Sequence, residues 1–195
     1  MEDAIERAKE VTKKIFDLYR KYGANDYIGE PVSQTEHMVQ AAMLAEKEGF
    51  GDDVILGAFF HDIGHLIGFD QGLSQMGDVG TDKHDIVGQT YLRDLGFPDS
   101  VTNMVWGHVE AKRYLVFKDA GYHEKLSEAS KLTLVYQGGP MNEEEANRFE
   151  SLSVFKAMVK MRSWDEQAKE SGAIIEPLEK YENMCQRFLE NILSC

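Results

Sequence analysis

The stretch that decides the fold is Ala58-Phe59-Phe60-His61-Asp62-Ile63-Gly64-His65. An apolar run leads directly into a His-Asp pair, and a second histidine follows four residues after the first. Because residues four apart share one face of an α-helix, the sequence predicts a helix from about residue 52 through residue 65, with His61 and His65 facing one pocket. Asp62 lies about 100° further around such a helix, where its carboxylate can reach the rim of the pocket or bridge two ions.

Imidazole and carboxylate groups together are typical ligands of iron, manganese and zinc. The alternative interpretation is a buried helix end whose polar groups are satisfied by hydrogen bonds. Since this one helix supplies three candidate ligands, the stretch favours a metal site.

The composition fits one domain and restricts the partners. The chain has 195 residues, of which 43% are hydrophobic, and it contains neither a long apolar run nor a signal-peptide pattern, so we expect a cytoplasmic protein without a membrane span. The formal net charge of -13 argues against a nucleic-acid surface. An anionic substrate can bind only where metal ions and a few Lys or Arg reverse the local field. Cys185 and Cys195 lack CxxC spacing, so we interpret them as reduced thiols and not as ligands.

The apolar periodicity predicts helices throughout and no strand, which gives an all-α helical bundle in one domain over residues 1–195, with packing helices at both ends. A glycine-rich segment, residues 66–82, is predicted to form a flexible loop over the pocket. Capping patterns at Ser33 and Asn142 mark two helix starts. The other predicted helices lie over residues 4–22 and 127–135, and start near His84, Pro98, Ser153 and Leu178.

Five of the six histidines fall near predicted helix ends in the first 110 residues, whereas His123 lies in a polar loop and is expected at the surface. His37 shares a face with small apolar residues and is either a core histidine or a ligand. Arg162 and Asp165 are three apart on one helix face and could form an ordinary surface pair. With Asp62 and Asp165 there are about seven candidate ligands, more than one metal needs, so two metals sharing Asp62 is the economical arrangement. Lys112, four residues after His108, overlooks the same place.

The pattern His37…His61-Asp62…Asp165 resembles the H…HD…D signature of the HD-domain superfamily. Most of its members are phosphohydrolases, but some, such as myo-inositol oxygenase, are mixed-valent di-iron oxygenases. Longer segments resemble the PhnZ-like phosphonate dioxygenases of that second group, and the similarity covers roughly residues 12–185. These segments are residues 26–30, 107–115, 136–141 and 162–165.

The resemblance implies a mixed-valent Fe²⁺/Fe³⁺ pair, with O₂ as co-substrate. One iron would be held by His37, His61, Asp62 and Asp165, and the other by Asp62, His84 and His108, with Asp62 bridging. Tyr27 would occupy an iron position until substrate arrives, and Glu30 would contact the amine of the substrate. The phosphonate would be bound by His65, Lys112, Ser130, Thr133, Gln137 and Arg162. Tyr27, Glu30, His65 and Lys112 are the expected catalytic residues.

The implied reaction is cleavage of the carbon–phosphorus bond of (R)-2-amino-1-hydroxyethylphosphonate to glycine and phosphate, in organophosphonate catabolism. A 2-oxoglutarate/Fe-dependent hydroxylase is the expected functional partner that supplies the substrate. The same chemistry on 1-hydroxy-2-(trimethylamino)ethylphosphonate or hydroxymethylphosphonate is an alternative. Two further alternatives for the function are a metal-dependent phosphohydrolase and a non-catalytic HD module.

Overall fold

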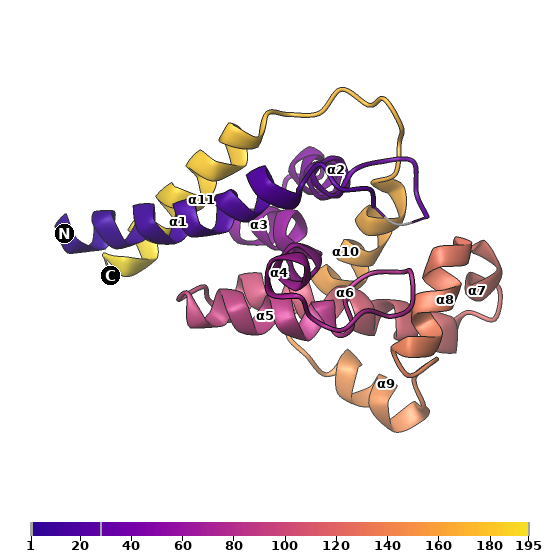
Figure 1. Cartoon of the computed structure of the whole chain (residues 1–195). Coiled ribbons are helices and arrows are strands. Elements are labelled where there is room, and N and C mark those ends of the chain that lie inside the picture. Colours follow the sequence, from indigo (N-terminus) through magenta and orange to yellow (C-terminus); the bar gives the residue numbers. More distant parts are fainter. Residues whose placement is uncertain (1, 28, 195) are drawn as a thin grey trace.

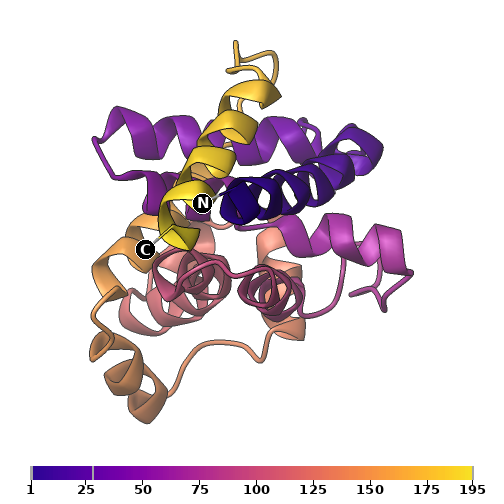
Figure 2. The same ribbon diagram turned by 90° about the vertical axis from the view of Figure 1, so that its left-hand side faces the viewer.

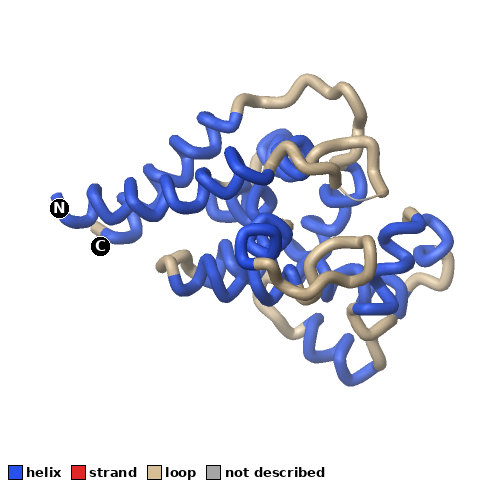
Figure 3. Tube along the Cα trace, in the orientation of Figure 1, coloured by secondary structure: helices blue, strands red, loops and turns tan. Residues whose placement is uncertain are grey.

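A computed structural model describes residues 2–27 and 29–194 of the chain. Within these residues the protein has eleven α-helices and two isolated β-bridges and no strand, so the predicted all-α fold is confirmed (Figure 3). Cys195 lies outside the described residues. The helices are α1 Glu2–Tyr22, α2 Gln34–Lys47, α3 Asp52–Phe60, α4 Ile63–Gln71, α5 His84–Asp94, α6 Asp99–Lys118, α7 Tyr122–Lys125, α8 Glu128–Tyr136, α9 Glu143–Glu150, α10 Phe155–Gln167 and α11 Leu178–Leu193.

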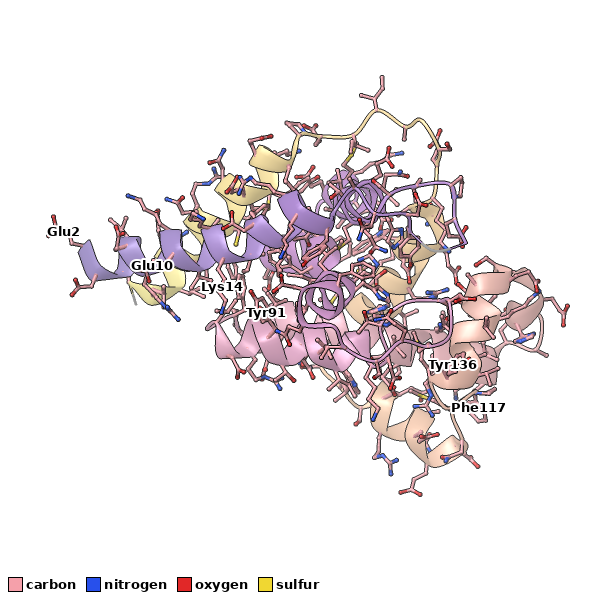
Figure 4. The ribbon with its side chains drawn as sticks, in the orientation of Figure 1. Glu2, Glu10, Lys14, Tyr91, Phe117 and Tyr136 are labelled. Atoms are coloured by element: carbon pink, nitrogen blue, oxygen red, sulfur yellow. The ribbon has the colours of Figure 1, made fainter. Side chains whose placement is uncertain are left out.

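Helix α3 lies at the centre of the bundle, between the terminal helices and α2, α6 and α10. Figure 1 shows α1 and α11 side by side at one end of the molecule, and Figure 2 views that end, where both termini lie. Phe59 of α3 stacks on Tyr19 of α1 at 4.7 Å and on Tyr181 of α11 at 4.9 Å between ring centroids. At the edge of α1, Lys14 lies over the ring of Tyr91 of α5 (Figure 4). The two stacking contacts of Phe59 hold in place the helix that leads into the His-Asp pair.

The predicted single helix over residues 52–65 is wrong, because the chain bends at the His-Asp pair. Helix α3 ends at Phe60 and α4 begins at Ile63, with Asp62 at φ -106° and ψ 13° between them. This conformation lies outside the α-helical region and interrupts the helical hydrogen bonds. As a result His61 and His65 do not project from one continuous helix, and the Asp62 carboxylate turns into the interior.

Residues 66–82 are also more ordered than predicted. Their first six residues belong to α4, whose Leu66 and Ile67 are buried in the core. The loop proper, residues 72–83, carries an isolated bridge between Gln75 and Thr81. Buried apolar side chains at helical spacing therefore outweigh the glycines in the first part of this segment.

The capping boxes predicted at Ser33 and Asn142 are both present, each with reciprocal hydrogen bonds to the glutamate three residues on. Helix α7, which carries His123, was not predicted, and the His123 side chain is half-exposed. Cys185 is a buried free cysteine beside Thr12. No helix of the described chain is long and apolar enough to cross a membrane. The cytoplasmic location stays a prediction.

Helix α4 approaches the start of α5 so closely that only glycine fits at position 64. A Cβ atom on Gly64 would lie 1.9 Å from the carbonyl oxygen of His84. We expect Gly64→Ala to lower the free energy of unfolding by about 3 kcal/mol or more, the upper range of overpacking effects, because two backbones must separate. Urea unfolding of the metal-free protein measures this. Gly121→Ala is the control, since a Cβ atom there would lie 3.5 Å from Oδ1 of Asp119, an ordinary contact distance.

Candidate metal centre

Four histidines from four helical segments meet around the Asp62 carboxylate. His37 belongs to α2, His61 follows α3, His84 is the first residue of α5, and His108 belongs to α6. All four side chains and Asp62 are buried. Their ligand atoms form two groups of three that share the aspartate: His37, His61 and Asp62, and Asp62, His84 and His108.

Each oxygen of Asp62 faces one pair of histidines. Oδ2 lies 3.4 Å from Nε2 of His37 and 3.3 Å from Nε2 of His61. Oδ1 lies 3.3 Å from Nε2 of both His84 and His108. Burial acts to raise the pKa of Asp62, but His61 and the other imidazoles hold it well below its usual range. The carboxylate is therefore ionised and placed to bridge two cations, one between each pair of rings.

The other ring nitrogen of each histidine points to a backbone carbonyl, which fixes the ring. The Nδ1 atoms lie at these distances from their acceptors: His37 2.9 Å from Ala168, His61 2.8 Å from Ala58, His84 3.3 Å from Thr81 and His108 2.6 Å from Val105. A carbonyl accepts only, so Nδ1 carries the proton and the Nε2 lone pair points inward.

The inward-pointing lone pairs face one another at short range. Nε2 of His37 is 2.9 Å from Nε2 of His61, and the His84 and His108 Nε2 atoms are 3.1 Å apart. Two acceptors at this distance repel each other unless a proton or a cation lies between or beside them. Four imidazoles and an ionised carboxylate in this arrangement fit two transition-metal ions.

Asp165 and Tyr27 flank the first pair of histidines. Asp165 Oδ1 lies 3.3 Å from His37 Nε2 and 3.9 Å from His61 Nε2, while its other oxygen is bound by Arg162. The ring of Tyr27 stacks on that of His37 with 3.9 Å between centroids. Burial, reinforced by the two aspartates, raises the pKa of Tyr27 well above 10, so its phenol is neutral without a cation beside it. Both side chains therefore lie beside the first pair of histidines, and the resemblance implies that they are further ligands of the first metal.

His65 differs from the other four histidines in which ring nitrogen carries the proton. Its Nδ1 accepts a hydrogen bond from the backbone N–H of Thr81 at 3.0 Å, so Nε2 carries the proton when the ring is neutral. Burial lowers the pKa of His65 to about 4, which keeps the ring neutral near pH 7. Its Nε2 is 4.0 Å from Asp62 Oδ1. His65 therefore offers the site a hydrogen-bond donor, whereas a metal ligand needs a lone pair.

A substitution at His65 can distinguish a hydrogen-bond donor from a metal ligand. We expect His65→Asn to keep two metals per chain, because the asparagine oxygen can replace Nδ1 as the acceptor for Thr81. Loss of the Nε2–H donor should raise KM for an anionic substrate about 10- to 100-fold, the value of one hydrogen bond to a charged group. Elemental analysis and steady-state kinetics measure both quantities. His84→Asn is the matched comparison, since that change should remove a metal, and equal metal loss in both variants would assign His65 as a ligand.

A cavity of about 50 Å³ opens beside the two groups, and most of the predicted substrate residues line it. Lys112 is buried in its wall and donates to Thr133 Oγ1 at 2.8 Å. The side-chain oxygen of Gln137 is buried without a hydrogen-bond partner among the described residues. Tyr27, Glu30, His65 and Ser130 complete the predicted residues of the lining.

Arg162 is buried but does not line the cavity. Its guanidinium binds Asp165, contacts Glu166 Oε1 through Nε at 3.1 Å, and donates to Ser130 at 3.3 Å. The Arg162–Asp165 contact is therefore not a surface pair, because the two side chains are only 4% and 3% exposed. In this position Arg162 can affect the site only indirectly, by positioning Asp165 and Ser130.

Lys169 also lines the cavity, and the sequence analysis missed it. Its Nζ binds Glu30 Oε1 at 2.6 Å. Its only signal is the position four residues after Asp165, and α10 ends at Gln167 before that helical spacing is complete. A lone lysine in a polar stretch gives no pattern that distinguishes it from a surface residue.

Comparisons with known proteins agree with this site. Residues 35–149 match the HD domain family model. The chain is 45% identical to the uncharacterized protein L432 of Acanthamoeba polyphaga mimivirus over 90% of this chain and 80% of that protein. It is 36% identical to the [1-hydroxy-2-(trimethylamino)ethyl]phosphonate dioxygenase (glycine-betaine-forming) of Leisingera caerulea, over 92% and 91%. It is 35% identical to the hydroxymethylphosphonate dioxygenase of Gimesia maris, over 91% and 87%.

The chain therefore belongs to the HD-domain family, and the matched residues include the His61-Asp62 pair. Within that family it belongs to the oxygenase group that includes these two phosphonate dioxygenases. Asp165 and Lys169 lie beyond residues 35–149, which the HD model matches. They do lie within the part of the chain that aligns with the two dioxygenases, which is over nine-tenths of its length.

Proposed function

We propose that this protein uses O₂ and two iron ions to cleave the carbon–phosphorus bond of a 1-hydroxyphosphonate. The observation that carries the proposal is the Asp62 carboxylate between two pairs of inward Nε2 lone pairs, beside a cavity whose walls donate hydrogen bonds. Our proposed substrate is (R)-2-amino-1-hydroxyethylphosphonate, with glycine and phosphate as products. The reaction is balanced, because one O₂ takes four electrons from the substrate and its two oxygen atoms enter the products.

The mixed set of imidazole and carboxylate donors supports the choice of iron. His37, His61 and Asp165 would hold one ion and His84 and His108 the other, with Asp62 shared. When bound, a mixed-valent pair supplies a redox centre for O₂ and a Lewis acid for the C1 hydroxyl group. Tyr27 is the proposed substrate-free ligand of the first ion, and ligation would replace its proton.

Different residues of the cavity would bind the two ends of the substrate. His65 Nε2–H and the Lys112 ammonium are donors for the phosphonate, with the hydroxyl groups of Ser130 and Thr133 beside Lys112. Glu30 offers a carboxylate to an ammonium group at the other end. Fixing both ends would hold C1 in one orientation beside the metals.

Oxygen uptake and phosphate release by the iron-loaded protein test the proposal. We expect equal moles of O₂ consumed and phosphate formed from (R)-2-amino-1-hydroxyethylphosphonate, with glycine as the second product. Phosphate release from a phosphate monoester without O₂ uptake would instead establish the phosphohydrolase. Less than one metal per chain after iron loading would support the non-catalytic module.

Lys112 should make substrate binding depend on pH. Burial, with Arg162 nearby, lowers the pKa of Lys112 to about 7. A lysine is charged below its pKa, so its attraction to the phosphonate is full in weak acid and is lost as the pH rises through this value. We expect Lys112→Met to raise KM about 10- to 100-fold at pH 6.5, the value of one hydrogen bond to a charged group, and the ratio of the two KM values to shrink towards pH 9. A ratio that is constant with pH would contradict this assignment.

The C1 hydroxyl group of the proposed substrate must be installed before this enzyme acts. The expected 2-oxoglutarate/Fe-dependent phosphonate hydroxylase stays a prediction, as does a place in organophosphonate catabolism. Both would be tested by supplying the unhydroxylated phosphonate to the two proteins together.

A further inference from the structure

One wall of the cavity already carries a cation. Lys169 Nζ binds Glu30 Oε1 at 2.6 Å, and the side chains are only 16% and 11% exposed. The same ammonium lies over the Tyr27 ring, 5.8 Å from its centroid. Lys169 therefore engages both features that attract a positively charged group, a carboxylate and an aromatic face.

The position of Lys169 is fixed by the metal centre itself. Lys169 follows the last turn of α10, and the neighbouring carbonyl of Ala168 accepts from His37 Nδ1. The next residue, Glu170, is held through its backbone N–H and carbonyl by Gln40 of α2. The backbone on both sides of Lys169 is therefore held in place, and its ammonium is held by the 2.6 Å ion pair with Glu30.

We propose that Lys169 is a specificity-determining residue, whose tethered ammonium occupies the place that a trimethylammonium group would need. This inference rests on the proposed function. It restricts the substrates to small 1-hydroxyphosphonates whose far end is hydrogen or a primary amine. It does not depend on which of these two the enzyme prefers.

The chemistry of the two amines explains the selection. A primary ammonium has N–H groups and can donate to Glu30 Oε2 while Lys169 keeps Oε1. A trimethylammonium group has no donor, so it needs aromatic faces and the absence of like charge. Tyr27 is the only Phe, Tyr or Trp among the described residues of the cavity, and its ring already contacts His37 and Lys169. Both amines meet the charge of Lys169, but only the primary ammonium gains a hydrogen bond to Glu30. The bulkier quaternary group would need the space and the Tyr27 ring that the Lys169 ammonium already occupies.

The first test compares three compounds with the iron-loaded wild-type protein. We expect kcat/KM for 1-hydroxy-2-(trimethylamino)ethylphosphonate to be at least about 100-fold below that for the 2-amino compound, the upper value of one hydrogen bond to a charged group, because the quaternary group cannot donate to Glu30. Hydroxymethylphosphonate serves as the reference that lacks a far end. Equal use of the trimethylamino compound would overturn the inference while leaving the proposed function intact. Absence of O₂-dependent phosphate release from all three compounds would overturn the proposed function.

The second test changes the lysine. Lys169→Met keeps an unbranched side chain but frees the Tyr27 ring for a quaternary ammonium, so it should narrow the ratio of the two kcat/KM values about tenfold, the value of one desolvated cation–π contact. Lys169→Arg should preserve the ratio. The control is Lys160→Met. Lys160 belongs to α10 and also pairs with a glutamate, Glu48, at 2.8 Å, but its side chain is 42% exposed and does not line the cavity.

A binding measurement gives a readout that does not require turnover. Calorimetry under anaerobic conditions would compare 2-aminoethylphosphonate with 2-(trimethylamino)ethylphosphonate, which both lack the hydroxyl group. The ratio of their dissociation constants should fall about tenfold in Lys169→Met, because the freed Tyr27 ring favours the quaternary cation. An unchanged ratio in a variant with two irons per chain would assign Lys169 a purely structural role. If Lys169→Met binds fewer irons, Lys169→Gln and the wild-type comparison decide the question.

Discussion

Replacing Asp62 with Asn should reduce the metal content from two ions per chain to less than one and lower kcat/KM at least about 1000-fold, the upper range for loss of one charge-stabilising group in an active site. Asp62 is the only ligand shared by both groups of three in the described chain. The amide has the same shape, but it lacks the negative charge and has a single acceptor oxygen. One oxygen cannot serve both pairs of histidines.

The control for this change is Asp85→Asn. Asp85 is a buried carboxyl group that follows the His84 ligand directly, and burial raises its pKa. It belongs to neither group of metal-binding residues. The Asp85 variant should keep two metals, as measured by elemental analysis and by the iron spectrum. Two tightly bound metals in Asp62→Asn would exclude the bridging role and, with it, the basis of the proposed oxidation.

The sequence could indicate the residues of the candidate centre because polar residues of these types are rare in a core. Five histidines and two aspartates near helix ends, in a chain with ample apolar residues, require a common reason for burial. The structure brings all seven around one point, although Asp62 and His65 reach it by another route than predicted. Helical periodicity continues through residues 58–65, and only a tertiary contact, the approach of α5 to Gly64, shows why the chain bends there.

The roles of the charged residues around the centre could not be read from their spacing. Arg162 and Asp165 are three apart, which is equally typical of an exposed pair and of this buried one. Glu30 and Lys169 are 139 residues apart, so no local pattern joins them. The proton on His65 depends on the backbone N–H of Thr81, in a loop whose conformation the sequence leaves open. Long-range contacts of this kind are what decide the substrate.

Arg162→Met should lower the free energy of unfolding of the metal-free protein by about 3–5 kcal/mol, as expected when one partner of a buried ion pair is removed. The Asp165 carboxylate would then remain buried with no guanidinium to offset its lost hydration. Burial acts to raise the pKa of Asp165, and Arg162 is the main cause that holds it well below the usual range. For a domain of this size the loss corresponds to a fall in Tm of roughly 6–20 °C, measurable by calorimetry.

Two controls separate this effect from a general loss of charge. Arg148→Met removes an exposed partner of Glu144 on α9 and should change the free energy of unfolding by less than about 0.5 kcal/mol. The double variant Arg162→Met/Asp165→Leu should recover part of the stability, because no unpaired carboxylate remains. Iron loading should also reduce the cost of Arg162→Met, since a cation beside Asp165 replaces the lost guanidinium. A cost that is the same with and without iron would show that Asp165 does not bind the metal.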